Sequence, residues 1–213
     1  MKIQSIEESI WDIILNQNFS ASHLHDSNKC IDFLMRLSCR GESVLWCGLN
    51  QGEQFVRCCS LGFECFGIDF SARALALTQE RLETAGLRAT LSKIDLRHLH
   101  QLHVFTAFDY IVLPGICGLL GSKSAKSRFF RVLLRYAKVG SIILLSDILD
   151  DGTREFPLKK DGPSIIPYTH NESICINAGL FCINYVTYQC DGYHRFFAAY
   201  LFKEQDPDGN FSS

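Results

Sequence analysis

The chain has 213 residues and a formal net charge of −2, with 47% hydrophobic and 21% charged residues. This composition is typical of a globular protein and excludes a fibrous or disordered chain, and the length favours a single domain. The near-neutral charge gives no general electrostatic case for binding nucleic acid or an anionic membrane. We expect a soluble, cytoplasmic domain, because the N-terminal residues lack a secretory pattern and no apolar run approaches the ~18 residues of a membrane span.

From residue 42 onward, short apolar runs alternate with helical patterns. This alternation is typical of a parallel sheet with crossover helices. The expected strands are 44–47, 63–68, 89–93, 109–113 and 140–146. The expected helices between them are 52–60, 71–85 and 122–138.

The chain changes character after the fifth expected strand. Residues 150–168 carry three prolines and several charges, which indicates a loop or insertion. A helix over 171–178 is expected to precede two strands, 181–189 and 195–203, whose Asp191-Gly192 junction predicts a hairpin. The prediction is therefore an α/β, doubly wound, mostly parallel seven-stranded sheet with a C-terminal antiparallel hairpin.

The remaining segments complete a single predicted domain, 1–213. Two helices, 5–16 and 27–37, are expected within an N-terminal lid that spans residues 1–41. The sheet core spans 42–203, and 204–213 is a polar tail that we expect to be frayed.

Neither the cysteines nor the histidines indicate a metal centre. None of the ten cysteines forms a Cys-x-x-Cys pair, and most are expected to be small buried residues. The histidines His98, His100 and His103 lie close together in the sequence but lack nearby Asp, Glu or Cys at ligand spacing, so we interpret them as exposed. We predict no metal site.

Glycines and acids follow the expected strands where a parallel sheet binds ligands, outside the carboxyl ends. The first strand leads into a turn that contains Gly48 and Gly52, and Asp69 follows the second strand 21 residues after Gly48. An acid at this offset is positioned to accept hydrogen bonds from ribose hydroxyls. Asp95 ends the third strand. Taken singly, each acid is also explained as a helix cap.

In combination, these features resemble the class I S-adenosylmethionine-dependent methyltransferases over about residues 43–203. The sequences VLWCGLNQG (44–52), FECFGIDFS (63–71), IDL (94–96), FDYIV (108–112) and AKVGS (137–141) are similar to successive family motifs. The resemblance implies a Rossmann-like fold, S-adenosylmethionine as cofactor and S-adenosylhomocysteine as product. The implied cofactor-binding residues are Trp46, Gly48, Leu49, Asn50, Gly52, Asp69, Phe70, Ile94, Asp95, Leu96, Leu113 and Pro114.

Two positions depart from the family pattern. Trp46 stands where the family has an acid that orients the methionine end of the cofactor, and Asn50 replaces the middle glycine. We expect the methionine ammonium to need another partner, such as backbone carbonyls near Gly48. Asn50 is a tolerable exchange, because asparagine enters left-handed conformations more readily than most residues.

The candidate catalytic groups are Asp147, Tyr168 and His170. His170 has a suitable ordinary pKa for a general base, although a helix N-terminal or surface histidine is the simpler explanation. Residues 162–168 show a slight similarity to the thiopurine and tellurite methyltransferase branch. The LPGI sequence (113–116) differs from the DPPY-like motif of amino-group methylation of DNA bases. We therefore expect in-line transfer to O, N or S of a small molecule, without DNA or membrane partners.

Two alternatives remain open. The chain is also explained as a catalytically inactive methyltransferase-like partner or regulatory domain. A third hypothesis is an RNA or protein methyltransferase that docks through the basic helix 122–138. On that helix Arg128, Arg131, Arg135 and Lys138 are expected to share an arc of about 80°. Such a stripe is also the ordinary solvated face of a crossover helix.

Overall fold

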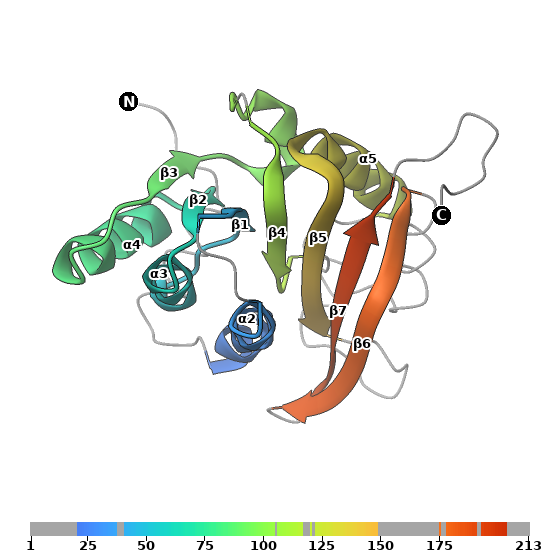
Figure 1. Ribbon diagram of the computed structural model, residues 1–213, viewed down its shortest axis with the longest axis horizontal. Coiled ribbons are helices and arrows are strands. Elements are labelled where there is room, and N and C mark those ends of the chain that lie inside the picture. Colours follow the sequence, from blue (N-terminus) through green and yellow to red (C-terminus); the bar gives the residue numbers. More distant parts are fainter. Residues whose placement is uncertain are drawn as a thin grey trace.

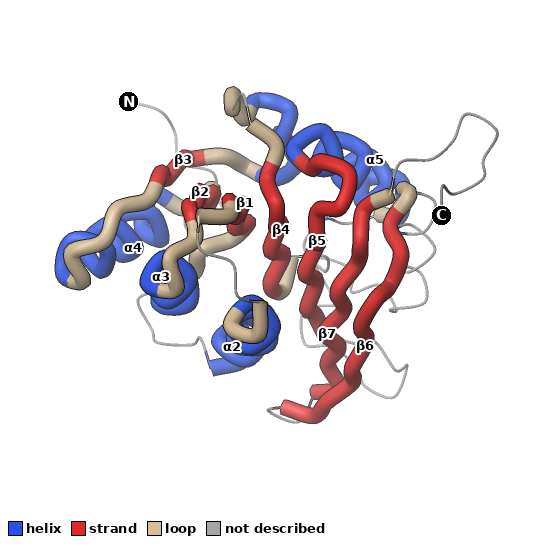
Figure 2. Tube along the Cα trace, viewed as in Figure 1, coloured by secondary structure: helices blue, strands red, loops and turns tan. Residues whose placement is uncertain are grey.

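A computed structural model describes residues 21–37, 41–104, 106–116, 120, 122–148, 175, 178–190 and 193–203. Its centre is a seven-stranded sheet in the order β3-β2-β1-β4-β5-β7-β6 (Figures 1 and 2). The strands are β1 (Ser43–Cys47), β2 (Glu64–Asp69), β3 (Thr90–Lys93), β4 (Phe108–Pro114), β5 (Ala137–Ile148), β6 (Leu180–Cys190) and β7 (Tyr193–Phe202). Strands β1 to β5 are parallel, and β7 is antiparallel to β5 and β6. The predicted fold class is confirmed.

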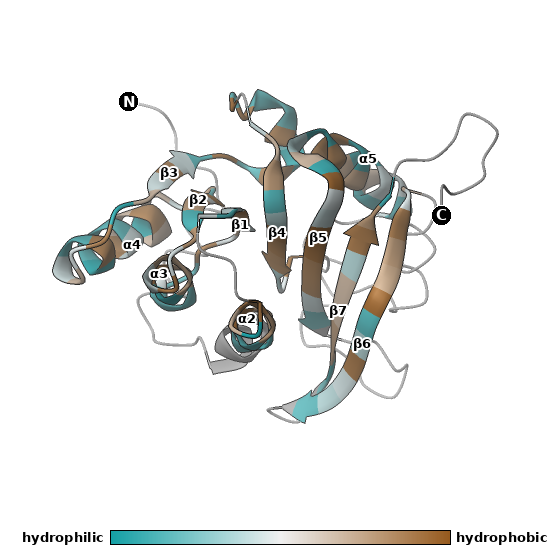
Figure 3. Cartoon of the chain, viewed as in Figure 1, coloured by the Kyte–Doolittle hydropathy of each residue, from teal (hydrophilic) through white to brown (hydrophobic). Residues whose placement is uncertain are grey.

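Helices cover both faces of this sheet. They are α2 (Ala21–Leu34), α3 (Glu53–Ser60), α4 (Ala72–Thr84) and α5 (Lys123–Leu133), with 3-10 helices η1 (Leu96–Gln101) and η3 (Leu134–Tyr136). Alternate residues of β1 enter two separate cores, because successive strand side chains point to opposite faces. Trp46 packs with α2 and α3, whereas Cys47 packs with η1 and α5. The β5 ribbon is mostly hydrophobic, as expected for a strand covered on both faces (Figure 3).

The strand order reverses between β1 and β4. The chain runs outward from β1 through β2 to β3 and then returns to place β4 on the other side of β1. Loops that leave β1 and β4 therefore diverge at the carboxyl edge of the sheet, which is where open parallel sheets bind ligands.

The end of the basic helix differs from the prediction. Helix α5 ends at Leu133, η3 follows, and β5 already begins at Ala137. Lys138 is therefore a strand residue, paired with Asp109, and does not belong to the helical stripe. The early start of β5 accompanies a shift in its register with β4, between Phe108 and Tyr110. The Ser141 hydroxyl bridges it by accepting from Lys138 N (2.8 Å) and donating to Phe108 O (2.7 Å).

Helix α2 begins at Ala21, earlier than the predicted 27–37 helix, and packs on the sheet face. Its Cys30, Ile31 and Leu34 belong to the same core as Trp46. The predicted helix 5–16, the loop 150–168, the tail 204–213 and most of the helix 171–178 lie outside the described residues. The lid role of residues 1–41 and the domain limits stay predictions.

Seven of the cysteines in the described part of the chain are free thiols. Six of these are buried, and Cys182 is exposed, in agreement with the expectation that most are small core residues. Burial raises the pKa of the Cys47 thiol above its usual range, so this cysteine is a packing residue in the core. Among the described residues, no helix is long and apolar enough to cross a membrane.

Candidate functional site

The site begins in the loop between β1 and α3, where three residues adopt left-handed backbone conformations. The φ angles are +88° at Gly48, +53° at Asn50 and +78° at Gly52. A Cβ atom on Gly48 would lie 2.6 Å from Ile116 Cδ1, and one on Gly52 would lie 2.4 Å from Thr78 Oγ1. Gly52 is therefore required by space as well as by conformation, because Thr78 Cα also lies 2.8 Å away, whereas Gly48 is required by its conformation, since a Cβ there would displace only the end of the Ile116 side chain. Asn50 takes the conformation that the sequence predicted for it.

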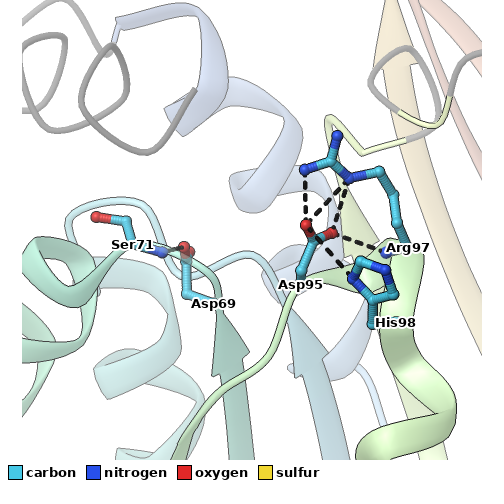
Figure 4. A network of polar contacts seen from close by, with 5 residues as sticks. All are labelled: Asp69, Ser71, Asp95, Arg97 and His98. Atoms are coloured by element: carbon cyan, nitrogen blue, oxygen red, sulfur yellow. Dashed lines mark hydrogen bonds and ion pairs between the residues drawn. The ribbon is translucent and has the colours of Figure 1, made fainter. Parts of the chain in front are cut away.

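Asp69, at the end of β2, fastens this loop to the sheet; Figure 4 shows its side chain beside Ser71. Its Oδ2 accepts hydrogen bonds from Leu49 N (2.7 Å) and Asn50 N (3.4 Å), and its Oδ1 accepts one from Ser71 N (2.9 Å). The carboxylate is only 7% exposed. Burial raises its pKa, and the amide hydrogen bonds oppose that rise. Asp69 thus has a structural role that the sequence did not reveal, beside the predicted ribose role.

Ser71 starts the next helix beside Asp69. Its hydroxyl accepts a hydrogen bond from Ala74 N (3.1 Å) and so caps α4 as predicted. Gly48 N in turn donates to Ile68 O (2.8 Å). The loop after β1 and the turn after β2 are therefore linked by hydrogen bonds to the Ile68 carbonyl and to the Asp69 side chain.

Trp46 fills the position of the family acid with a buried indole. Its Nε1–H donates to Gly48 O (3.1 Å), and its ring packs edge-on against Phe55 at 6.3 Å between centroids. A carbonyl oxygen has two lone pairs, so Gly48 O keeps one acceptor position. At the position where the family pattern has an acid, the Trp46 indole thus holds the first loop through a neutral hydrogen bond.

Asp95 follows β3, the strand that pairs with β2. Ile94 N donates a hydrogen bond to Asp69 O (2.9 Å). Asp95 caps η1 through Arg97 N (2.9 Å) and forms a two-pronged pair with the Arg97 guanidinium, with Nη2–Oδ2 at 2.6 Å and Nε–Oδ1 at 3.1 Å (Figure 4). His98 Nδ1 lies 3.9 Å from the same carboxylate. Partial burial alone would raise the pKa of Asp95, but Arg97 outweighs it and holds that pKa below its ordinary value.

The other predicted cofactor residues surround these two acids. Leu113 and Pro114 are buried at the end of β4, and Gly115 N donates to Ser146 O (2.7 Å) of β5. Phe70, Ile94 and Leu96 are half-buried at the ends of β2 and β3. A small hollow between α2 and the first loop is lined by Ser27, Trp46, Leu49, Asn50, Gln51, Gly52, Glu53 and Gln54.

Of the three catalytic candidates, only Asp147 lies in the described part of the chain. It is buried on β5 opposite Phe196, and by alternation with Leu145 its side chain lies on the α5 side of the sheet. Tyr168, His170 and the 162–168 segment lie outside the described residues. Within the described ranges, no three His, Cys, Asp or Glu side chains are grouped so as to hold a metal ion.

Sequence reasoning missed three residues that shape the site. Ile116 packs beside Gly48, Thr78 packs beside Gly52, and Arg97 forms hydrogen bonds to the Asp95 carboxylate. The Asp-x-Arg spacing at a helix start was an available signal for the last of these. The packing partners of the glycines carried no signal, because they come from distant segments.

Neither a protein-family model nor a curated protein matches the sequence. Solved structures do match. The magnesium protoporphyrin IX methyltransferase ChlM from Synechocystis PCC 6803, with bound S-adenosylhomocysteine, has a TM-score of 0.70 at 16% identity, over 85% of this chain and 83% of that chain. The N-methyltransferase NodS from Bradyrhizobium japonicum WM9, also with S-adenosylhomocysteine, has a TM-score of 0.67 at 16% identity, over 83% of this chain and 87% of that chain.

A third similar structure is named for a different reaction. The [4+2]-cyclase SpnF has a TM-score of 0.61 at 15% identity, over 76% of this chain and 75% of that chain. At these identities the likeness establishes the fold, and activity has to be argued from the site. The chain has the fold of S-adenosylmethionine-dependent methyltransferases, as the sequence motifs predicted.

Proposed function

We propose that the chain is a class I S-adenosylmethionine-dependent methyltransferase that acts on an O, N or S atom of a small molecule. The observation that carries this proposal is the left-handed loop at residues 48–52, built against Asp69 at the strand-order reversal. The fold supports it, because two proteins of this fold hold S-adenosylhomocysteine. When bound, S-adenosylmethionine supplies an activated methyl group on a sulfonium.

The residues at the carboxyl edge fit the parts of this cofactor. The left-handed φ at Gly48 turns the first loop tightly at the carboxyl end of β1. The free acceptor position on Gly48 O suits the methionine ammonium. The Asp69 carboxylate is held by the backbone amides of Leu49, Asn50, Phe70 and Ser71, and a carboxylate has about four acceptor positions, so a ribose hydroxyl would share or replace one of these contacts, of which Asn50 N at 3.4 Å is the longest with a measured distance.

The adenine end is assigned to Asp95 with its apolar neighbours. Its carboxylate suits the adenine amino group as an acceptor, and Ile94, Leu96, Leu113 and Pro114 offer apolar surface around it. Arg97 now holds both Asp95 oxygens. Because that pair is partly exposed, water and a ligand can exchange with it at small cost.

The protein's contribution to methyl transfer is mainly positioning. In-line displacement needs the acceptor atom held near the methyl carbon, together with a base if the acceptor is protonated. Asp147, Tyr168 and His170 are the proposed groups for that base. The small-molecule acceptor is supported by the magnesium protoporphyrin IX methyltransferase of the same fold.

A second candidate function is an inactive methyltransferase-like partner domain. Trp46 favours it, because the position of the family acid is occupied by an indole that already uses Gly48 O. SpnF also shows that this fold occurs in a protein named for a different activity. Cofactor binding without turnover would select this second function.

Calorimetric titration with S-adenosylmethionine and S-adenosylhomocysteine tests the cofactor site. We expect saturable binding of both, weakened at least tenfold (1.4 kcal/mol) by Asp69→Asn. Glu80→Gln on the exposed side of α4 is the matched control and should bind like the wild type. No binding at millimolar cofactor, or equal binding by Asp69→Asn and the wild type, would contradict the assignment.

The acceptor class needs a separate experiment. The protein is incubated with methyl-labelled S-adenosylmethionine and separate pools of small metabolites, RNA and proteins. Label in the metabolite pool supports the proposed function, and label only in RNA or protein overturns the small-molecule acceptor.

A further inference from the structure

The positive charges of the chain are concentrated in one stretch. Residues 96–146 contain seven of the 21 Lys and Arg residues and three of the seven histidines, but only one of the 23 acids. The rest of the chain, with 14 cations and 22 acids, has a formal net charge of −8. The net charge of −2 is therefore the sum of a basic segment, residues 96–146, and an acidic remainder.

The fold gathers the outer side chains of this segment into one layer. The Tyr136 hydroxyl, after α5, donates to Leu99 O (3.0 Å) and Leu102 O (2.8 Å), which fastens η1 beside α5. Leu99 and Phe130 share the core beneath them. The exposed histidines of η1 and the exposed cations of α5 and η3 then lie on the outside of this layer. We call this set the basic face: His98, His100, Lys123, Arg128, Arg131 and Arg135.

Three arginines of the basic face, Arg128, Arg131 and Arg135, are exposed and form no ion pair within the described part of the chain. Arg97 and Lys138, in contrast, are paired with Asp95 and Asp109. At 100° per residue Arg128 and Arg131 lie about 60° apart on α5, and Arg135 follows on the 3-10 helix η3 that continues it. The three form a line of exposed positive charge.

The chemistry of this face favours a phosphate backbone over a membrane or a protein. None of the exposed large hydrophobic residues in the described part of the chain (Met35, Val139, Ile183, Tyr185 and Val186) belongs to α5 or η1. Membrane-surface helices and protein interfaces both need apolar contacts at their centre. Arginine binds phosphate with two parallel hydrogen bonds, and only phosphate contacts need no apolar centre.

The exposed imidazoles favour a single strand. His98 and His100 pack edge to face at 6.2 Å between ring centroids and are both exposed. Histidine rings can stack on unpaired bases, which a duplex does not offer. We infer that the basic face binds single-stranded RNA, with Arg128, Arg131 and Arg135 on successive phosphates.

The arginines of the basic face are not among the residues of the proposed function. They belong to α5 and η3, whereas the cofactor assignment rests on Asp69, Asp95 and the loop after β1. His98 lies 3.9 Å from Asp95, so the arginines and not the histidines carry the test. RNA on this face requires neither the cofactor nor a particular methyl acceptor. A failure of cofactor binding therefore leaves the inference standing, and the reverse also holds.

Fluorescence anisotropy with a labelled 20-nucleotide oligouridine tests the inference directly. The variants are Arg128→Glu/Arg131→Glu/Arg135→Glu and a control with the same charge change, Arg73→Glu/Arg81→Glu/Arg88→Glu, whose arginines are exposed on and just after α4. Three phosphate contacts contribute a slope of roughly −2 in log affinity against log salt. We expect the wild type to lose at least about 20-fold in affinity between 50 and 200 mM salt. The α5 variant should lose binding, and the α4 variant should retain most of it.

Several results would overturn the inference. These are no salt-dependent binding by the wild type, equal losses in the two variants, or equally strong competition by polyglutamate of matched charge. The second result would mean that only net charge matters, and the third would indicate an acidic protein partner. Circular dichroism of both variants shows whether a loss of binding reflects unfolding.

Discussion

The carboxylates of Asp69 and Asp95 lie at the ends of neighbouring strands in opposite environments. Asp69 is buried and accepts hydrogen bonds only from backbone amides of its own and the preceding loop. Asp95 is partly exposed and is held by a side chain two residues away. The difference indicates that Asp69 belongs to the scaffold of the site, whereas Asp95 is an exchangeable contact whose partner a ligand can replace.

The largest expected effect is that of Asp69→Ala. It leaves the buried amides of Leu49 and Ser71 without their acceptor, and hydrogen bonds to charged groups are worth about 1.5–3 kcal/mol each. We expect the free energy of unfolding to fall by about 3 kcal/mol or more, together with loss of cofactor binding. Urea denaturation followed by circular dichroism measures the first effect. A change below about 1 kcal/mol would show that Asp69 is not part of the scaffold.

Gly52→Ala tests whether the loop that Asp69 holds tolerates a side chain. The left-handed φ costs about 1–3 kcal/mol for a residue other than glycine, and the added Cβ meets Thr78. Gly86→Ala is the matched control, because Gly86 also has a positive φ (+65°) but open space around it. Thermal unfolding should show a larger decrease in Tm for Gly52→Ala. Equal decreases would mean that backbone conformation alone matters there.

A third carboxylate, that of Asp109 near the start of β4, extends the comparison to the pH dependence of stability. Partial burial alone would raise its pKa, but Lys138 and the amide and hydroxyl of Ser43 (3.0 and 2.9 Å) outweigh it and lower that pKa. An acid with a lowered folded pKa contributes stability above its unfolded value of ~3.9 and loses it as the pH falls through the folded value. Asp109→Asn should therefore lower the unfolding free energy by about 1 kcal/mol at pH 7. Urea titrations from pH 7 down to pH 2.5 should show this difference decrease as the pH falls below ~3.9. A difference that stays constant over this range would exclude the charge as its cause.

The smallest effect on stability is expected from Arg97→Ala. Exposed ion pairs contribute about 0–1 kcal/mol, so the unfolding free energy should change by less than ~1 kcal/mol. The Asp95 oxygens are released, and S-adenosylhomocysteine should bind several-fold more tightly in calorimetry. Arg88→Ala, an exposed arginine before β3, is the control. A loss of stability above ~2 kcal/mol would place the Asp95 pair in the scaffold as well.

Periodicity and glycine spacing predicted the sheet, its reversal point and the first loop. The apolar runs before Gly48, Asp69 and Pro114 identified the strand ends, because strands buried on both faces have almost uninterrupted hydrophobic sequences. The left-handed turn was predictable because glycine and asparagine adopt a positive φ most readily. These features depend on local sequence and were therefore accessible.

The interactions within the site were less accessible. The Asp69 contacts with the first loop depend on how two strands pair, and the Arg97 contact depends on the geometry of a 3-10 turn. The basic helix was predicted too long, because Ser141 links Lys138 to Phe108 of the neighbouring strand. Helical periodicity also did not predict that Lys126 is fully buried. The Asp69 contacts and the Ser141–Phe108 hydrogen bond join distant segments, whereas the Arg97 contact is local and its Asp-x-Arg spacing was an available signal.

A crystal structure of the protein grown with S-adenosylhomocysteine tests the central claim most directly. We predict the ligand at the carboxyl edge, with its ribose hydroxyls on Asp69, its adenine amino group on Asp95, and the loop of residues 48–52 unchanged. An empty edge at saturating ligand, or a ligand bound elsewhere on the protein, would contradict the account.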